Sequence, residues 1–398
     1  MNLILFDTAV RNHLLPFTHT RPVADIRCGI LTMRERWELY LQRASSTASV
    51  PVLQAAFPVH YNETENLYIN AAVFATPALG IVISNLKPGQ ALVQDETIIA
   101  IYTDAALDYE ALNAASLKDY EPVLCSEPFQ QLQQVWDIFN LNDYAIRSDF
   151  AILTYQKESQ PIPAHVTLIG EAKNVFIEEG AIVSACILNA QTGPVYIAKE
   201  AEIMEGCMLR GPLALSTHAV VKMGAKIYGA TTIGAGSKVG GEISNVVFFD
   251  NSNKGHDGFV GNAVIGEWCN LGADTNASNL KNNYDEVSIW SEAEGAMIKT
   301  GLQFCGLLMG DHSKCGINTM FNTGTVVGVS SNIYGGDFPD KYVPSFSWGG
   351  KNDMTTYRFD KALDTANRMM ARRGKTLSDA EIAVLQHIFD HKENYIKQ

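Results

Sequence analysis

The chain has 398 residues, 46% hydrophobic and 18% charged, a composition that excludes a disordered or fibrous protein and predicts two or three folded domains. Its net charge of -13, from 30 basic and 43 acidic residues, argues against nucleic-acid binding, because such a chain repels phosphate. Seven cysteines without a repeated C-x-x-C pair exclude a disulfide framework, and no segment approaches the ~18 apolar residues of a membrane span, so we expect a cytoplasmic protein.

The first predicted domain, residues 1–155, alternates apolar strand-like runs with helical stretches. The runs cover residues 3–6, 67–69 and 98–102, and the helical stretches cover 30–42 and 129–139. This alternation is typical of an α/β sheet domain. The proline-containing segment 159–163 predicts the connection to the next domain.

The second predicted domain, residues 156–350, carries a six-residue period. Eight consecutive aliphatic residues stand six apart: Ile197, Ile203, Leu209, Leu215, Val221, Ile227, Ile233 and Val239. A period of six fits neither a helix nor a single strand, but it fits a chain wound in triangular coils with one aliphatic residue per side at the axis. We therefore predict a left-handed parallel β-helix of hexapeptide repeats.

The period resumes after two interruptions. Phe259, Ile265 and Leu271 are in phase, and a third run comprises Met309, Cys315, Phe321, Val327 and Ile333. Val239 and Phe259 are 20 residues apart instead of 18, which predicts a bulge, and a second break spans about 279–300. Loops expelled from a rigid solenoid can present side chains to a ligand, although each break can also be a tolerated insertion.

The last segment, residues 351–398, predicts two helices, over 355–373 and 378–392. Gly374 fits the end of the first helix. Ser378 and Glu381 have the spacing of a capping box at the start of the second.

A histidine in the first interruption is the candidate general base. His256 stands in S-N-K-G-H-D-G-F-V-G-N over 252–262, and the next coil reads N-L-G-A-D-T-N-A-S-N-L-K over 270–281. Acyl transfer to an amine requires removal of a proton, for which histidine, with an ordinary pKa of ~6.5, is suited. Asn270 and Asn279 carry amides that can orient reactants, although asparagine also favours tight corners and a loop histidine is often only solvated.

These two segments resemble the acetyltransferase half of GlmU, the bifunctional N-acetylglucosamine-1-phosphate uridylyltransferase and glucosamine-1-phosphate N-acetyltransferase. The family motifs H-L-x-Y-x-G-D and N-x-G-A-G-T-x-x-x-N have counterparts at matching spacing, 14 residues from His256 to Asn270 and nine more to Asn279. The resemblance covers about residues 195–335. Four positions depart from the motifs, and Phe259 lacks the hydroxyl that the family tyrosine offers to the substrate; the others are Asp257, Asn262 and Asp274.

The resemblance implies acetyl transfer from acetyl-CoA to the amine of an aminosugar phosphate, in a homotrimer with sites between subunits. It implies His256 as the base, Asn270 and Asn279 as positioning amides, and three cations that hold the sugar phosphate: Arg210, Lys254 and Lys281. Lys314 is the candidate for the phosphates of acetyl-CoA. A second group, on the first C-terminal helix, is either part of that site or a solvated helix face: Arg368, Arg372, Arg373 and Lys375.

The N-terminal residues resemble the sugar-nucleotidyltransferase signature G-x-G-T-R-x-x-P-L-T-x-x-x-P-K. The segment R-N-H-L-L-P-F-T-H-T-R-P over 11–22 matches part of it, which makes Arg11 and Arg21 nucleotide-binding candidates, but residues 6–10 lack the glycines. Nucleotidyl transfer also needs Mg²⁺ held by carboxylates. No ligand set is evident, and the candidates are Asp7, Asp95, Asp137 and Asp149.

Two alternative functions remain open from the sequence. One is a sugar-1-phosphate nucleotidyltransferase that takes a nucleoside triphosphate and whose β-helix serves oligomerisation. The other is a regulatory protein that binds a sugar nucleotide without catalysis. A zinc site similar to that of γ-class carbonic anhydrases is not favoured, because His218, His256 and His312 are not spaced one coil apart.

Overall fold

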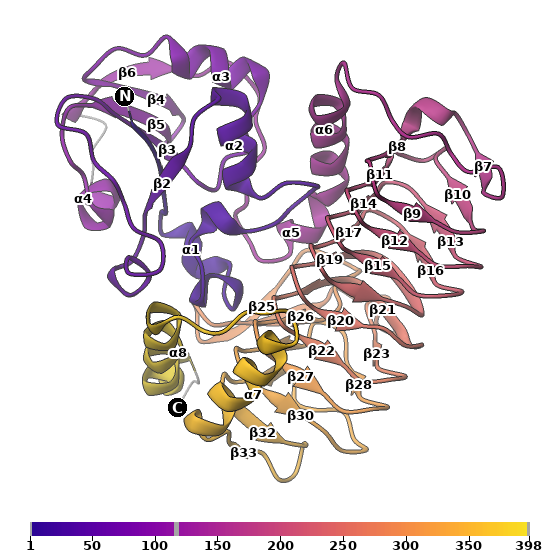
Figure 1. The fold of residues 1–398 in the computed structure, drawn as a ribbon. Coiled ribbons are helices and arrows are strands. Elements are labelled where there is room, and N and C mark those ends of the chain that lie inside the picture. Colours follow the sequence, from indigo (N-terminus) through magenta and orange to yellow (C-terminus); the bar gives the residue numbers. More distant parts are fainter. Residues whose placement is uncertain (1, 115–118, 396–398) are drawn as a thin grey trace. The chain divides into compact units, whose positions relative to one another are not determined.

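The computed structural model describes residues 2–114 and 119–395, and the chain forms two compact units (Figure 1). The first comprises residues 1–26, 31–135 and 378–387, and the second comprises residues 27–30, 136–377 and 388–398. Among the described residues, no helix is both long and apolar enough to cross a membrane.

The first unit is built on a six-stranded mixed sheet. Its strand order is β2-β1-β3-β5-β4-β6, with β1 parallel to β2 and β3, and β5 antiparallel to both of its neighbours. The three predicted apolar runs lie in β1, β3 and β5, and their buried side chains form the core. The strands are β1 (Asn2–Phe6), β2 (Ser45–Ala48), β3 (Asn66–Asn70), β4 (Gln90–Gln94), β5 (Thr97–Thr103) and β6 (Glu121–Leu124).

Short helices connect these strands. They are α1 (Val10–His13), α2 (Met33–Leu41), α3 (Pro77–Ser84) and α4 (Tyr109–Ala114), with single 3₁₀ turns at Phe17–His19, Val23–Asp25 and Pro51–Leu53. The helix predicted over 129–139 is wrong for most of its length. Backbone hydrogen bonds pair residues 130–132 with residues 72–74 in an extended arrangement, so that only α5 (Asp137–Asn140) is helical.

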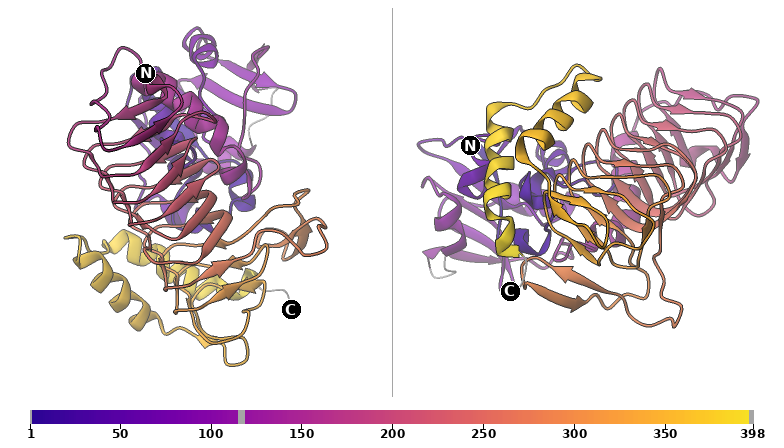
Figure 2. Two further views of the ribbon diagram at one scale, coloured as in Figure 1. Left: turned by 90° about the vertical axis from the view of Figure 1, so that its right-hand side faces the viewer. Right: turned by 90° about the horizontal axis from the view of Figure 1, so that it is seen from below.

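The second unit contains the predicted parallel β-solenoid, whose coils stack in register (Figure 2). Each coil has three sides, which we name faces A, B and C in the order in which the chain visits them. Face A contains β8 (Val175–Ile177), β11 (Val195–Ile197), β14 (Leu213–Leu215), β17 (Thr231–Ile233), β26 (Leu308–Met309), β29 (Val326–Val327) and β31 (Tyr342–Val343).

Face B contains β9 (Ile182–Val183), β12 (Glu202–Ile203), β15 (Val220–Val221), β18 (Lys238–Val239), β20 (Asn253–Lys254), β22 (Asn270–Leu271), β27 (Lys314–Cys315), β30 (Asn332–Ile333), β32 (Ser347–Gly349) and β33 (Thr355–Thr356). Face C contains β7 (Thr167–Ile169), β10 (Ile187–Asn189), β13 (Met208–Arg210), β16 (Lys226–Tyr228), β23 (Asn276–Ala277) and β28 (Met320–Phe321). Two longer strands, β19 (Glu242–Phe248) and β21 (Phe259–Ile265), turn the corner from face C to face A.

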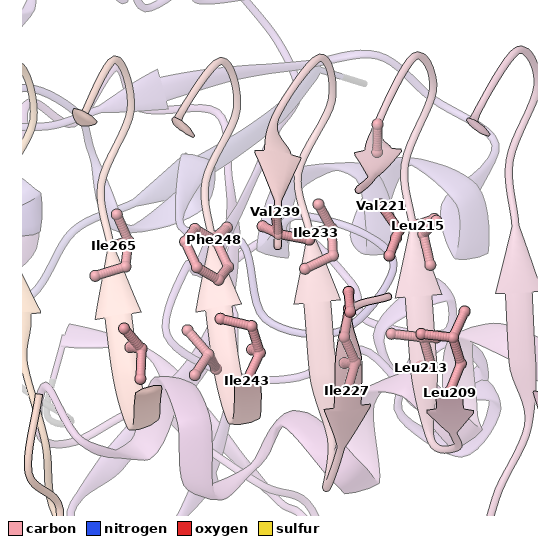
Figure 3. Packing of buried hydrophobic residues seen from close by; sticks show 14 of the residues in the cluster. Leu209, Leu213, Leu215, Val221, Ile227, Ile233, Val239, Ile243, Phe248 and Ile265 are labelled. Carbon is pink, nitrogen blue, oxygen red and sulfur yellow. The ribbon is translucent and has the colours of Figure 1, made fainter. Parts of the chain in front are cut away.

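The aliphatic residues of the period fill the inside of the coils (Figure 3). All eight members of the first run and all five of the third run are buried, as predicted. The middle run is corrected at one position: Val260, not Phe259, points inward, because the neighbouring coils pair with β21 through Ile243 and Ala277 opposite Val260.

The predicted bulge before Phe259 is a change of coil length. Val239 pairs with Lys254, 15 residues later, whereas Val221 and Val239 are 18 residues apart. Gly240 and Gly241 make the shortened corner; Gly241 has a φ of 76° there and leaves no room for a side chain. The chain therefore contracts its coil and keeps its backbone in the stack.

The second break is an expelled hairpin, as predicted. The strands β24 (Ser288–Ser291) and β25 (Ala296–Lys299) pair antiparallel outside the coils. The Trp290 ring stacks on Tyr342 with centroids 5.2 Å apart. The amide of Cys305 donates to the carbonyl of Asn279 at 2.9 Å, so the chain re-enters the stack where it left it.

Helices cover part of the solenoid. α6 (Asn142–Thr154) packs on face A, where Phe150 meets Tyr196 with ring centroids 6.5 Å apart. By sequence position, α6 falls within the first predicted domain, residues 1–155. α7 (Phe359–Ala371) and α8 (Asp379–His391) match the two predicted C-terminal helices, and Ser378 and Glu381 form the predicted capping box. The remaining 3₁₀ turns are Ala172–Asn174 and Lys392–Tyr395.

Candidate active site

A row of polar side chains runs down the outside of face B. The residue before each inward-facing one points outward, and the register places four such residues on consecutive coils: Lys238, Asn253, Asn270 and Lys314. Neighbouring strands of a sheet lie roughly 4.8 Å apart, so each side chain contacts the next. The Asn253 amide donates to the Asn270 side-chain oxygen at 3.0 Å.

The end of α7 and this row enclose a pocket of about 560 Å³. The helix contributes Arg368 and Met369, and the two residues that follow it contribute Arg372 and Arg373. Five of the eight lining residues are cationic and none is acidic, although the chain carries a net charge of -13. The pocket is therefore a local site for a polyanion against the overall charge.

Arg373 fixes the end of α7 on the solenoid. Its guanidinium donates to the Gly236 carbonyl and, at 2.8 Å, to the Asn251 side-chain oxygen. It also lies 5.7 Å from the centre of the Trp268 ring, and the Lys375 ammonium lies 5.8 Å from the same ring. These contacts hold the cations of α7 over face B.

Lys314, predicted to bind acetyl-CoA, lies in this pocket. Its ammonium donates to the His312 carbonyl at 2.7 Å. Burial lowers the pKa of Lys314 to about 8, so Lys314 is still protonated in most molecules at neutral pH.

His256 lies at the corner between faces B and C, three residues after Asn253. Its side chain is exposed in the single chain. Glycines flank the corner, and Gly258 has a φ of 106° with the Thr275 carbonyl packed directly against it. The Asp274 amide donates to the Asp257 carbonyl at 3.0 Å, so the next coil supports the corner.

Lys254 lies inside the coil, which corrects its expected role as a phosphate ligand. The contraction of the coil gives it the inward position of Val239 and Leu271, and it is 0% exposed. Its ammonium donates to the carbonyls of His256 at 2.6 Å and Asp257 at 2.9 Å. A sugar phosphate outside the coil cannot reach this amine.

Three other predicted residues lie away from His256 within one chain. Arg210 is on face C, three strands from β21, in a separate pocket of about 410 Å³ with Met208 and Tyr228. Asn279 donates to the Asn262 side-chain oxygen at 2.7 Å, at the opposite end of face C from His256. Lys281 donates to the Glu286 carbonyl at the base of the expelled hairpin.

Two polar lining residues were missed in the sequence, Lys238 and Asn253. The signal was present, because each stands one position before an inward residue, as Asn270 and Lys314 do. At Asn253 the contraction hid this signal, since Lys254 does not look like a core residue and breaks the aliphatic count.

One nucleotide-binding candidate of the first unit, Arg11, is engaged in holding the loop after β1. Arg11 donates to the Thr18 carbonyl at 2.7 Å, and its Nε lies 3.6 Å from the Asp7 carboxylate. Asp7 is fully buried and accepts from the Val23 amide at 2.9 Å, and burial raises its pKa. Arg21 is also buried.

In residues 2–114 and 119–395, no group of three or more His, Cys, Asp or Glu side chains is arranged to hold a metal ion. Of the candidate carboxylates, Asp95 is in the turn between β4 and β5 of the first unit, Asp137 opens α5, and Asp149 accepts from the Ile30 amide at 2.9 Å.

The two parts of the chain match known classes of protein. Residues 3–158 match the family model described as sugar nucleotidyl transferase, and a parallel β-solenoid with a six-residue period follows them in the chain. It is 29% identical over 218 residues to the bifunctional protein GlmU of Methanococcus vannielii, a match that covers 55% of this chain and 46% of the relative.

A second relative is the bifunctional sugar-1-phosphate nucleotidylyltransferase/acetyltransferase of Sulfurisphaera tokodaii, 30% identical over 146 residues, or 36% of each chain. The chain thus spans about half the length, or less, of these two relatives. The solved structure of the polySia-specific acetyltransferase NeuO matches 52% of this chain and 93% of its own at 14% identity, with a TM-score of 0.28, which supports no functional comparison.

The buried Lys254 makes a pH dependence of stability testable. In the folded chain burial lowers its pKa from 10.5 to about 8, so between these values the unfolded chain binds the extra proton and rising pH favours folding. From about pH 7.5 to about pH 10.5, we expect the free energy of unfolding of the wild type to rise by on the order of 3 kcal/mol relative to that of Lys254→Met. Urea unfolding of both proteins checks this; a pH-independent difference contradicts it.

Proposed function

We propose that the chain transfers an acetyl group from acetyl-CoA to the amine of an aminosugar phosphate such as glucosamine-1-phosphate. The observation that carries the proposal is the cationic pocket on face B, one of whose lining residues, Asn253, stands three residues before His256. Coenzyme A carries several phosphates and is a ligand for clustered arginine and lysine side chains.

In this mechanism the phosphates of acetyl-CoA bind Lys314, Arg372 and their neighbours. The amine nitrogen attacks the thioester carbonyl, and His256 accepts the proton that the amine loses. The Asn270 and Asn253 amides offer N–H donors to the carbonyl oxygen as it becomes negative. The carbon–sulfur bond breaks, the acetyl group remains on the sugar nitrogen, and the sulfur leaves as the thiol of CoA after taking up the proton that His256 accepted.

Three residues that the resemblance assigns to substrate binding lie away from His256 within one chain. Arg210, Asn279 and Lys281 lie on other parts of face C and its edge. A homotrimer with sites between protomers, as the resemblance to GlmU implies, would bring groups of a neighbouring protomer to His256. We propose this assembly and assign Arg210, Asn279 and Lys281 to the sugar side of the site.

The proposal is tested by thiol release from acetyl-CoA with a panel of hexosamine phosphates. We expect release of CoA with at least one aminosugar phosphate and none with its N-acetylated form, and a product heavier by one acetyl group. All seven cysteines are buried, so the protein itself contributes little thiol signal. Absence of turnover with every aminosugar phosphate would reject the proposal.

A second candidate function is nucleotidyl transfer by the first unit, favoured by the family match of residues 3–158. The sugar-nucleotide-binding regulator is the third. Pyrophosphate release from UTP or dTTP with a sugar-1-phosphate and Mg²⁺ tests the second. Binding of a UDP-sugar without either turnover would identify the third.

A further inference from the structure

One inward position of the solenoid holds a lysine instead of an apolar side chain. The face B column reads Val221, Val239, Lys254, Leu271 and Cys315 on consecutive coils. Burying an ammonium among such neighbours is unfavourable unless its hydrogen bonds are satisfied. The lysine therefore needs an explanation that packing alone does not supply.

The contacts of this ammonium are confined to the His256 corner. It donates to the carbonyl of His256 at 2.6 Å and to that of Asp257 at 2.9 Å, and its side chain has no exposed surface. Both peptide groups that follow the His256 Cα are thus bonded from within the coil. The Asp257 and Asp274 carboxylates favour the charged form, whereas burial disfavours it and lowers the pKa to about 8.

Besides the backbone hydrogen bonds that neighbouring coils donate to the Asp257 and Gly258 carbonyls, the residues of the corner add little stiffness of their own. Gly255 and Gly258 stand on either side of the His256–Asp257 pair, and glycine leaves a backbone many conformations. The imidazole itself is exposed, so its direction depends on the backbone that carries it. A charge-assisted hydrogen bond to each of two successive carbonyls restricts that backbone.

We propose that Lys254 is the positioning residue of His256, holding the corner from inside the coil so that the imidazole projects in one direction. The lysine touches neither substrate and acts through the backbone alone. The inference rests on the proposed function insofar as His256 is the base.

Lys254→Met tests this, because methionine fills a similar volume without a donor. We expect kcat for acetyl transfer to fall at least tenfold, with KM for acetyl-CoA and for the aminosugar phosphate within twofold of wild type. We also expect hydrogen exchange of the Asp274 amide, which donates to the Asp257 carbonyl of this corner, to accelerate at least tenfold. Leu271→Met, in the same column one coil later, is the matched control and should change neither quantity.

Unchanged exchange of the Asp274 amide in folded Lys254→Met would overturn the proposal, whatever its activity. Lys254→Gln, which keeps a donor on a shorter side chain, should lie between wild type and Lys254→Met in both measurements. If both variants fail to fold, the lysine stabilises the coil as a whole and the positioning role is rejected. If wild-type protein lacks acetyl transfer but the exchange result holds, the proposed function fails and the backbone role stands.

Discussion

Replacing His256 with alanine should lower kcat for acetyl transfer by about 10²–10⁴-fold, the range that a general base contributes. KM for acetyl-CoA should stay within about twofold, because the cationic pocket is intact. The imidazole is exposed and makes no packing contact that folding requires, so the variant should unfold at the same urea concentration as wild type. Steady-state thiol release at saturating aminosugar phosphate measures the effect.

His218→Ala provides the matched control. His218 also stands at a solenoid corner, with its side chain 63% exposed and its Nδ1 3.1 Å from the Glu200 carboxylate, but it belongs to a coil outside the candidate site. This variant should retain wild-type kcat. Equal losses in the two variants, or full activity in His256→Ala, would remove His256 from the mechanism.

Reversing two charges of α7, in Arg368→Glu/Arg372→Glu, should raise KM for acetyl-CoA by about 10–100-fold. Each arginine lines the pocket, and loss of two charge-assisted contacts to phosphate corresponds to about 1.4–2.8 kcal/mol. Turnover of acetyl-N-acetylcysteamine, a thioester without phosphates, should be unchanged. Arg373 is left in place because it anchors the helix on Gly236 and Asn251.

Lys361→Glu reverses a charge on the same helix outside this pocket and should leave KM for acetyl-CoA within about twofold. Higher salt should weaken acetyl-CoA binding in wild type more than in the double variant. Salt screens the attraction between cations and phosphates, and the wild type has two more pocket cations than the variant. If the double variant loses turnover of acetyl-CoA and of acetyl-N-acetylcysteamine equally, the arginines do not bind the nucleotide part of CoA.

The sequence predicts the solenoid well wherever a coil has its regular length. From Ile197 to Val239 each sixth residue is buried, because three sides of six residues return the chain to the same column. The count fails at Lys254 and Phe259, where a corner shortened by Gly240 and Gly241 changes the phase. A contracted coil and an expelled loop both interrupt the six-residue spacing in the sequence. Only the pairing of strands between neighbouring coils distinguishes the two.

The site was predictable in part for the same reason. Asn270 and Lys314 were both named as candidates from the sequence, and the register places them side by side, since the outward position before an inward residue repeats from coil to coil. The approach of Arg372 to that surface depends on how a helix packs after the solenoid ends, which no spacing encodes. Asn279 was paired with His256 by motif distance, yet the two lie at opposite ends of face C.

The expelled hairpin has a consequence for how this architecture can diverge. Asn279 and Cys305 are hydrogen-bonded neighbours, and Leu280 and Phe304 form a bridge beside them, so both ends of the insertion meet at one point of the stack. Evolution can therefore lengthen, trim or exchange this segment without shifting any later coil. Substrate preference in such proteins can change at this junction while the scaffold stays constant.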